Sequence, residues 1–200
     1  MKKIFNLVLG VCFLMSILLT SVLAEEASPV FFGKFEQGVG NVTIYIDSDS
    51  GANYWQVYIT GAANNWMYPG SGMSNPIYMQ FVSSTYGSKI DVYCQNDSYW
   101  TNQGYYGVLA ETKHYYSGVV IHPNSRNWSF TEIHINDDNF RLSSFTNDQA
   151  QGTMIHEMGH TLGLNENNDN PYSVMCQLGA GRIVQRVQEC DNNAIKAKYN

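Results

Sequence analysis

Residues 156–166, HEMGHTLGLNE, limit how this part of the chain can fold. Residues four apart on an α-helix are separated by about 40° in azimuth and about 6 Å in rise, so His156 and His160 are expected to project side by side. A helix continued to Glu166 would carry that residue about 15 Å from His156. Gly163 tolerates the left-handed conformation that ends helices. We therefore expect the chain to reverse at Gly163 and to bring Glu166 beneath the two histidines.

The same residues predict a metal site. Neutral imidazole nitrogens are good ligands for zinc, and two histidines on one helical face can hold one ion. Glu157 lies beside that face, where its carboxylate can take a proton from water without becoming a ligand. The spacing favours Glu166 as the third ligand, and Asp169 is an alternative that needs only a wider loop. The competing interpretation is a surface helix whose histidines face solvent.

Residues 1–24 are typical of a secretory signal peptide. Met1-Lys2-Lys3 precedes an almost uncharged run, which ends in the small-residue cleavage pattern Val22-Leu23-Ala24. A membrane anchor is the alternative, but acidic residues follow the run instead of a basic flank. We expect cleavage and secretion to the extracellular space, with no membrane attachment afterwards. Removing 24 of the 200 residues leaves 176, which suits a single domain. Residues 25–40 are interpreted as an N-terminal leader and 41–200 as the domain.

Charge and cysteine content narrow the function classes. The formal net charge of −6 becomes −8 when the signal lysines are removed, and no basic run remains. Such a chain is a poor partner for nucleic acid. Cys94, Cys176 and Cys190 remain after cleavage and allow three pairings in an oxidising compartment. We favour a Cys176–Cys190 disulfide because it is the most local, and the alternative is three buried thiols.

Periodicity and turn residues predict an α+β domain. Alternating or continuous apolar runs indicate strands, and apolar residues near a 3.6-residue period indicate helices. The order is strands with one early helix, followed by late helices. Strands are expected at 41–47, 76–84, 88–94, 104–112 and 128–136, and helices at 54–66, 149–163 and 189–199.

HEMGHTLGLNE followed by PYSVMC resembles the metzincin clan of zinc endopeptidases. The clan pattern is H-E-x-x-H-x-x-G-x-x-H/D, with a later tight turn containing Met below the metal; Ser173-Val174-Met175 is similar to that turn. The order of the segments 88–92, 107–110, 132–138 and 191–199 is most similar to the matrixin branch. The resemblance implies a metzincin-like fold: a twisted mixed β-sheet with an active-site helix and a C-terminal helix.

Three features depart from the clan pattern. Glu166 stands where His or Asp is usual, so its role as a ligand rests on spacing. The leader contains no cysteine, so latency through a cysteine switch is not expected. Gln177 follows Met175 by two residues, at the position where astacin-like and serralysin-like relatives have a tyrosine ligand.

The resemblance implies a zinc-dependent endopeptidase that acts on protein or peptide substrates. The substrate would lie extended along an edge strand at Val108, Leu109 and Ala110, and Glu157 would act as general base. We expect a monomer. The alternative, from another class, is a secreted binding or adhesion domain that retains the zinc site but does not catalyse hydrolysis.

Other polar residues have two interpretations each. His114, His122 and His134 could hold a second zinc, but their spacing favours surface or loop histidines. The run Asn136-Asp137-Asp138 could bind Ca²⁺, and a solvated turn explains it equally well.

Overall fold

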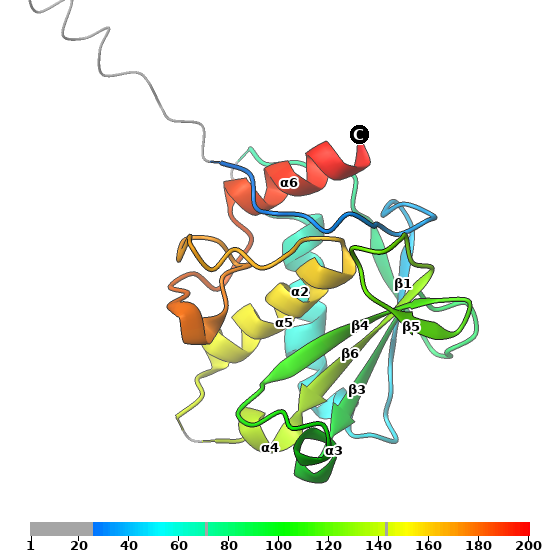
Figure 1. Cartoon of the computed structure of the whole chain (residues 1–200), viewed down its shortest axis with the longest axis vertical. Coiled ribbons are helices and arrows are strands. Elements are labelled where there is room, and N and C mark those ends of the chain that lie inside the picture. The colour runs from blue at the N-terminus through cyan, green and yellow to red at the C-terminus, as the bar shows by residue number, and fades with distance from the viewer. Residues whose placement is uncertain (1–25, 71, 143) are drawn as a thin grey trace, which may run out of the picture.

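A six-stranded mixed sheet forms the centre of the molecule (Figure 1). The computed structural model describes residues 26–70, 72–142 and 144–200. The strand order is β2-β1-β3-β6-β4-β5; neighbours are parallel from β2 to β6, whereas β4 is antiparallel to both β6 and β5. The strands are β1 (Val42–Ile46), β2 (Met79–Val82), β3 (Ile90–Gln95), β4 (Ala110–Tyr116), β5 (Val119–Ile121) and β6 (Phe130–Asn136).

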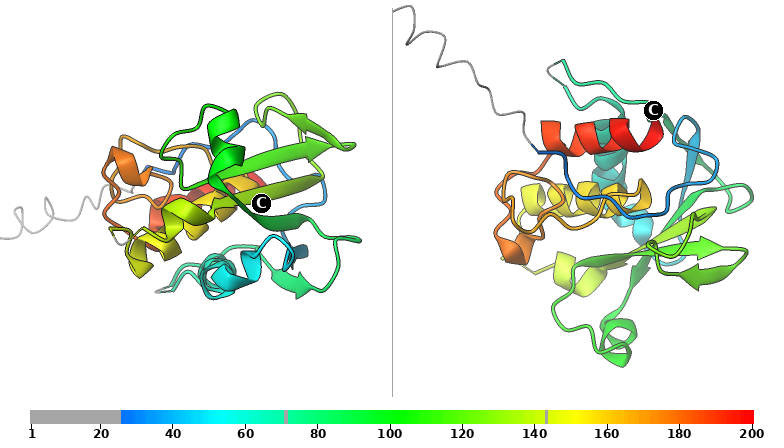
Figure 2. Two further views of the ribbon diagram at one scale, coloured as in Figure 1. Left: turned by 90° about the horizontal axis from the view of Figure 1, so that it is seen from below. Right: turned by 45° about the horizontal axis from the view of Figure 1, so that its top comes forward.

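Two long helices lie side by side on one face of this sheet (Figures 1 and 2). They are α2 (Gln56–Met67) and α5 (Asn147–Thr161), and a third helix, α6 (Glu189–Tyr199), ends the chain. Four shorter helical segments complete the structure: η1 (Ala52–Trp55), α3 (Asp97–Asn102), α4 (Asp137–Phe140) and η2 (Leu178–Ala180). The predicted α+β class, with a mixed sheet and a C-terminal helix, is confirmed.

Helix α5 begins two residues earlier than predicted because of its capping box. Thr146 accepts a hydrogen bond from the backbone N–H of Gln149, and the Gln149 side chain accepts one from the Thr146 N–H. These bonds satisfy N–H groups that a helix start otherwise leaves without partners. Thr146 lies on the short connection between α4 and α5.

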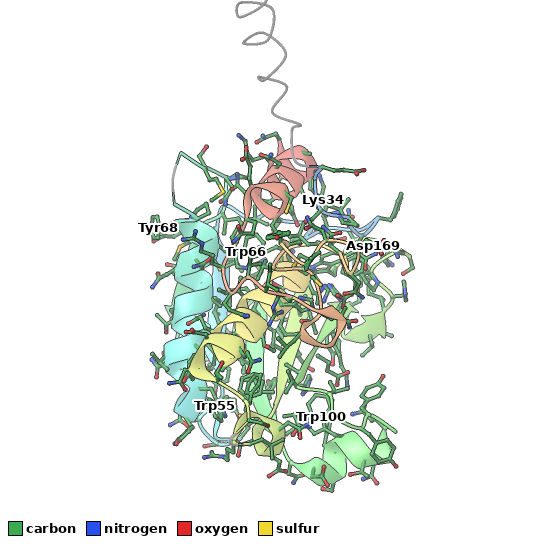
Figure 3. All side chains as sticks on the ribbon, turned by 90° about the vertical axis from the view of Figure 1, so that its left-hand side faces the viewer. Lys34, Trp55, Trp66, Tyr68, Trp100 and Asp169 are labelled. Carbon is green, nitrogen blue, oxygen red and sulfur yellow. The ribbon has the colours of Figure 1, made fainter. Side chains whose placement is uncertain are left out.

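The interface between α2 and α5 is part of one continuous core with the sheet. Trp55 and Trp66 mark its two ends in Figure 3. Trp66 is fully buried and donates from Nε1 to the carbonyl of Ile155 on α5 (2.9 Å). Burial of an indole needs such a partner, because an unpaired N–H would oppose it. This contact fixes α5 on α2 near the histidine pair.

Residues 26–40, which we interpreted as a leader, pack along the domain. The Phe31 N–H donates to the carbonyl of Gly163, and the Asn165 N–H donates to the carbonyl of Pro29. Ser28 and Phe35 are buried. Figure 1 shows this segment passing beside α6. The described part of the segment therefore supports the loop that follows α5.

The predicted signal peptide, 1–24, lies outside the described residues, and none of the described helices is long and apolar enough to span a membrane.

The predicted Cys176–Cys190 disulfide is absent. Among residues 26–200 without 71 and 143, no disulfide joins Cys94, Cys176 or Cys190, and all three are buried. The Sγ of Cys190 instead accepts a hydrogen bond from the side-chain amide of Asn170 (3.9 Å). Cys176 and Cys190 are the two cysteines closest in sequence, but closeness in sequence does not determine whether the two side chains are oriented to form a disulfide.

Asp191 joins the turn that contains Met175 to the start of α6. Its carboxylate is fully buried at the start of α6. One oxygen accepts hydrogen bonds from the hydroxyls of Ser28 (2.7 Å) and Ser173 (2.5 Å). The other accepts from the backbone N–H groups of Val174 and Gln188, both at 3.0 Å. The N-terminal segment, the methionine turn and α6 thus converge on one side chain.

Replacing Asp191 with Ala should destabilise the fold strongly. The substitution removes the acceptor of four donors, three of which lie on the buried residues Ser28, Ser173 and Val174, so the free energy of unfolding should fall by about 3 kcal/mol or more. Urea denaturation at fixed zinc concentration measures the loss. The matched control is Asp49→Ala at an exposed position, which should change stability by less than about 0.5 kcal/mol. Equal losses for the two variants would contradict this role of Asp191.

Candidate metal centre

Helix α5 presents His156 and His160 side by side, as their spacing predicted. Their Nε2 atoms lie 3.0 Å apart, and both residues are at most 9% exposed. Each imidazole Nδ1 faces a backbone carbonyl: His156 faces Val174 (2.9 Å) and His160 faces Leu164 (3.0 Å). Donation from Nδ1 to a carbonyl fixes the tautomer and leaves the Nε2 lone pair for a metal. Both rings are therefore oriented as metal ligands.

The chain reverses at Gly163, as predicted. Its φ of 99° lies in the left-handed region that favours glycine. The N–H of Gly163 donates to the carbonyl of His160, and the N–H of Leu164 donates to the carbonyl of Gly159, both at 3.0 Å. These two bonds form a Schellman motif. A Cβ at Gly163 would also meet the end of the flexible Lys198 side chain at 2.3 Å, but the positive φ is the constraint that requires glycine.

The reversal brings Glu166 to the two histidines. Its carboxylate oxygens lie 3.3 Å from the Nε2 of His160 and 3.5 Å from that of His156. Among the described residues, these three form the one His/Cys/Asp/Glu group whose donor atoms lie close enough to share an ion. Asp169, the alternative third ligand, is exposed on the following loop (Figure 3) and lies outside the group.

The donor geometry fits zinc. Zinc bonds of about 2.0–2.1 Å at tetrahedral angles separate neighbouring donor atoms by about 3.4 Å. The observed separations of 3.0, 3.3 and 3.5 Å bracket that value. Two imidazoles and one carboxylate form a ligand set found in catalytic zinc sites that keep a fourth position open. Oε2 of Glu166 is buried without a hydrogen-bond partner, and a cation between the three residues would satisfy it.

Electrostatics also favour positive charge at this point. Burial raises the pKa of Glu166, but its polar contacts with His156 and His160 outweigh burial and lower the pKa to about 2. For His160, burial lowers the pKa, whereas the carboxylates of Glu166 and Glu157 outweigh burial and raise it. The two carboxylates thus stabilise a cation placed between the imidazoles.

Met175 lies beneath the histidines, in the turn predicted from SVM. It is fully buried, and its Sδ would lie 2.4 Å from a Cβ placed at Gly159. The glycine therefore allows the methionine to touch the backbone of α5. The carbonyl of Val174 in the same turn orients His156. The turn consequently supports the site through packing and through one hydrogen bond.

Glu157 faces the cleft beside the three residues and is held by Thr112 of β4. The Thr112 hydroxyl lies 2.8 Å from Oε2 of Glu157 and 3.0 Å from its backbone carbonyl. The carboxylate is only 6% exposed. Thr112 was not predicted from the sequence, because its contact with α5 depends on how β4 packs on that helix. The predicted position of Glu157 on the flank of the histidine face agrees with the structure.

A cavity of ≈270 Å³ adjoins Glu157 and His156, and the predicted substrate-binding residues Val108, Leu109 and Ala110 line it. A second cavity of ≈510 Å³ lies beside Glu166 and shares the same two α5 residues. The cleft therefore extends to both sides of the histidine pair. Such a shape suits an extended chain that passes over the site.

The strand along this cleft begins later than predicted. We expected a strand over 104–112, but β4 starts at Ala110. The carbonyl of Val108 accepts hydrogen bonds from the side-chain amides of Asn136 and Asn139, both at 2.9 Å, and the Asn136 N–H donates to the carbonyl of Leu109 (2.8 Å). Asparagines from β6 and α4 therefore hold these residues in a loop, and apolar composition alone did not reveal them.

Two of the three other histidines differ from the prediction. We expected His114, His122 and His134 at the surface or in loops, but only His122 is exposed. His114 is buried against Trp128, and burial lowers its pKa to about 4. His134 is buried in β6 beside Tyr99. The three belong to no metal-binding group among the described residues.

The run 136–138 has structural partners. Asn136 caps α4 by accepting from the Asn139 N–H, and Asp138 accepts from the Asp97 N–H. Asp137 accepts hydrogen bonds from the side chains of Trp55 and Arg141, both at 2.7 Å. The three side chains thus serve separate contacts, which favours the turn interpretation over a shared calcium ion.

Removing Glu166 should weaken zinc binding while removing Asp169 should not. Removing a side chain that only hydrogen-bonds to a metal ligand costs about 10–100-fold in metal affinity. Removing a ligand itself should cost more, so Glu166→Ala should lower the zinc affinity at least about 100-fold. Asp169→Ala should keep about one zinc per chain. Elemental analysis after dialysis against buffered free zinc measures both. The reverse result would mean that the third ligand comes from residue 169.

The chain has structural neighbours among solved proteins. No protein-family model matches the chain, and no curated protein is significantly similar to it. Among solved structures, a chain of the GM1-bound form of the ECX AB5 holotoxin is 13% identical, with a TM-score of 0.51 over 86% of this chain and 88% of that one. High choriolytic enzyme 1, a hatching-enzyme zinc protease from Oryzias latipes, is 17% identical, with a TM-score of 0.46 over 86% and 94%. At this identity the holotoxin match shows a shared fold.

Proposed function

We propose that the chain is a secreted, monomeric zinc-dependent endopeptidase of the metzincin type, most similar to the matrixin branch. The observation that carries the proposal is the meeting of His156, His160 and Glu166 in a cleft beside Glu157. A structural metal site would be closed by a fourth protein ligand, whereas this group of three borders open cavities. The predicted signal peptide and the acidic charge support secretion without a nucleic-acid partner.

The free edge of β4 offers a place for an extended peptide. β4 pairs with β6 from Ala110 to Tyr115, but it pairs with β5 only from His114 to Tyr116. Among the described residues, no strand therefore pairs with the other side of residues 110–113. A peptide added along this edge would form backbone hydrogen bonds and pass over the histidine pair. This places the scissile bond near Glu157.

Glu157 is proposed to move the proton. A zinc ion held by the three residues would supply a Lewis acid that acidifies water and polarises a carbonyl group. Glu157 takes a proton from the attacking water, whose oxygen bonds to the scissile carbonyl carbon. Glu157 then delivers that proton to the amide nitrogen as the C–N bond breaks. Thr112 donates to the carboxylate and holds it toward the cleft.

A digest of a peptide library with and without a chelator tests the proposal. Chelator-sensitive cleavage that returns on adding zinc is the expected result. Binding of one zinc per chain with no cleavage of any peptide would favour the alternative, a secreted binding domain that retains the site.

Glu157→Gln should keep zinc and lose most cleavage. The substitution removes the base but leaves all three metal-binding side chains, and general-base catalysis contributes about 10²–10⁴-fold. Zinc content and kcat/KM on one cleaved peptide measure the two effects. Cleavage within a few-fold of the parent would refute the role of Glu157.

Thr112→Val should lower kcat about tenfold with little change in KM. Valine keeps the shape but removes one hydrogen bond to a carboxylate, which is worth about 1.5 kcal/mol. Thr112→Ser restores the hydroxyl and should recover most of the rate. Zinc content should stay near one in both variants. If the valine and serine variants had the same kcat, the hydroxyl would have no part in positioning Glu157.

A further inference from the structure

Arg182 is a buried cation at the wall of the smaller cavity. It follows η2 and is 5% exposed. Nη2 donates to the hydroxyl of Thr153 (3.2 Å), and Nη1 donates to the carbonyl of Cys176 (3.4 Å). Nε is buried and has no hydrogen-bond partner. None of the salt bridges formed by the described residues includes Arg182.

A buried guanidinium without a paired anion is unfavourable. Arginine does not lose its proton in proteins, so burial cannot be relieved by neutralisation. The charges that face it are the carboxylates of Glu157 and Glu166, which stabilise it only over a distance. Uncompensated charges are rarely kept inside a protein without a functional reason. An anion that entered from the cleft would supply the close partner that Arg182 does not have among the described residues.

The cavity beside Arg182 has the size and place for one substrate side chain. Its volume of ≈270 Å³ is just below the range of pockets for drug-sized ligands. Arg182 and Thr153 form one wall, and Ala110, His156 and Glu157 lie on the side of the metal site. A side chain in this cavity belongs to a residue next to the bond that Glu157 acts on.

We propose that Arg182 selects an acidic side chain, aspartate or glutamate, at a residue flanking the cleaved bond. This rests on the proposed peptidase function. A carboxylate in the cavity that Arg182 lines would pair with the buried positive charge, and arginine binds carboxylates with charge-assisted hydrogen bonds. A neutral amide of the same shape leaves the charge unpaired. The site therefore discriminates by charge more than by size.

Matched peptides test this selection. A cleaved sequence is made with Glu or Gln at each flanking position, and kcat/KM is measured for the zinc-loaded protein. The Glu peptide should be preferred about 10- to 100-fold, the range expected for hydrogen bonds to a charged group. Arg182→Met keeps the length of the side chain and should bring the ratio near one. Arg186→Met, an exposed arginine on the same loop, is the matched control and should keep the preference.

Binding provides a second measurement that does not depend on turnover. The zinc-loaded Glu157→Gln variant is titrated with the same peptides, with and without Arg182→Met. Tighter binding of the Glu peptide that depends on Arg182 supports the pocket, even if the parent protein cleaves nothing and the peptidase proposal fails. Cleavage with no preference for Glu would overturn the selection while the peptidase proposal stands.

A purely structural role for Arg182 predicts another pattern. If the guanidinium only balances Glu157 and Glu166, Arg182→Met would lower kcat/KM equally for both peptides, and that result overturns the proposal. Arg182→Lys keeps the positive charge and is included in case Arg182→Met does not fold. It should retain part of the preference for Glu. A lysine variant that folds and shows no preference counts against the proposal as well.

Discussion

The chain reversal at Gly163 is the constraint on which the candidate site depends. A straight helix would carry Glu166 far from His156, whereas the left-handed glycine turns the chain back to the histidines. The same turn orients a ligand, because the carbonyl of Leu164 faces the Nδ1 of His160. The end of the helix and the geometry of the metal site are thus one structural feature, and a side chain at Gly163 would disturb both.

Support for the other histidine comes from distant parts of the chain. The carbonyl of Val174 orients His156, and the N–H of Val174 donates to the buried carboxylate of Asp191. Asp191 also binds the hydroxyl of Ser28 in the N-terminal segment. The methionine turn is therefore held between α5, α6 and residues 26–40. Each of these contacts uses a buried donor that would be costly to leave without an acceptor.

Strand β4 gives the cleft its open edge and also holds the carboxylate of Glu157. Its short pairing with β5 leaves residues 110–113 without a neighbour on one side, and Thr112 from this stretch holds Glu157. The smaller cavity adds a buried cation, Arg182, near two carboxylates. Opposite charges therefore line the same cleft.

The sequence by itself determined the features that depend on local geometry. Helical spacing paired His156 with His160, a glycine marked the reversal, and periodicity located the main helices and strands. Only the tertiary structure decided where β4 begins, which way the cysteine sulfurs point, and that Thr112 and Arg182 border the cleft. The physical reason is that periodicity reports which face of an element is apolar, whereas hydrogen bonds between residues far apart in the chain depend on how the elements pack.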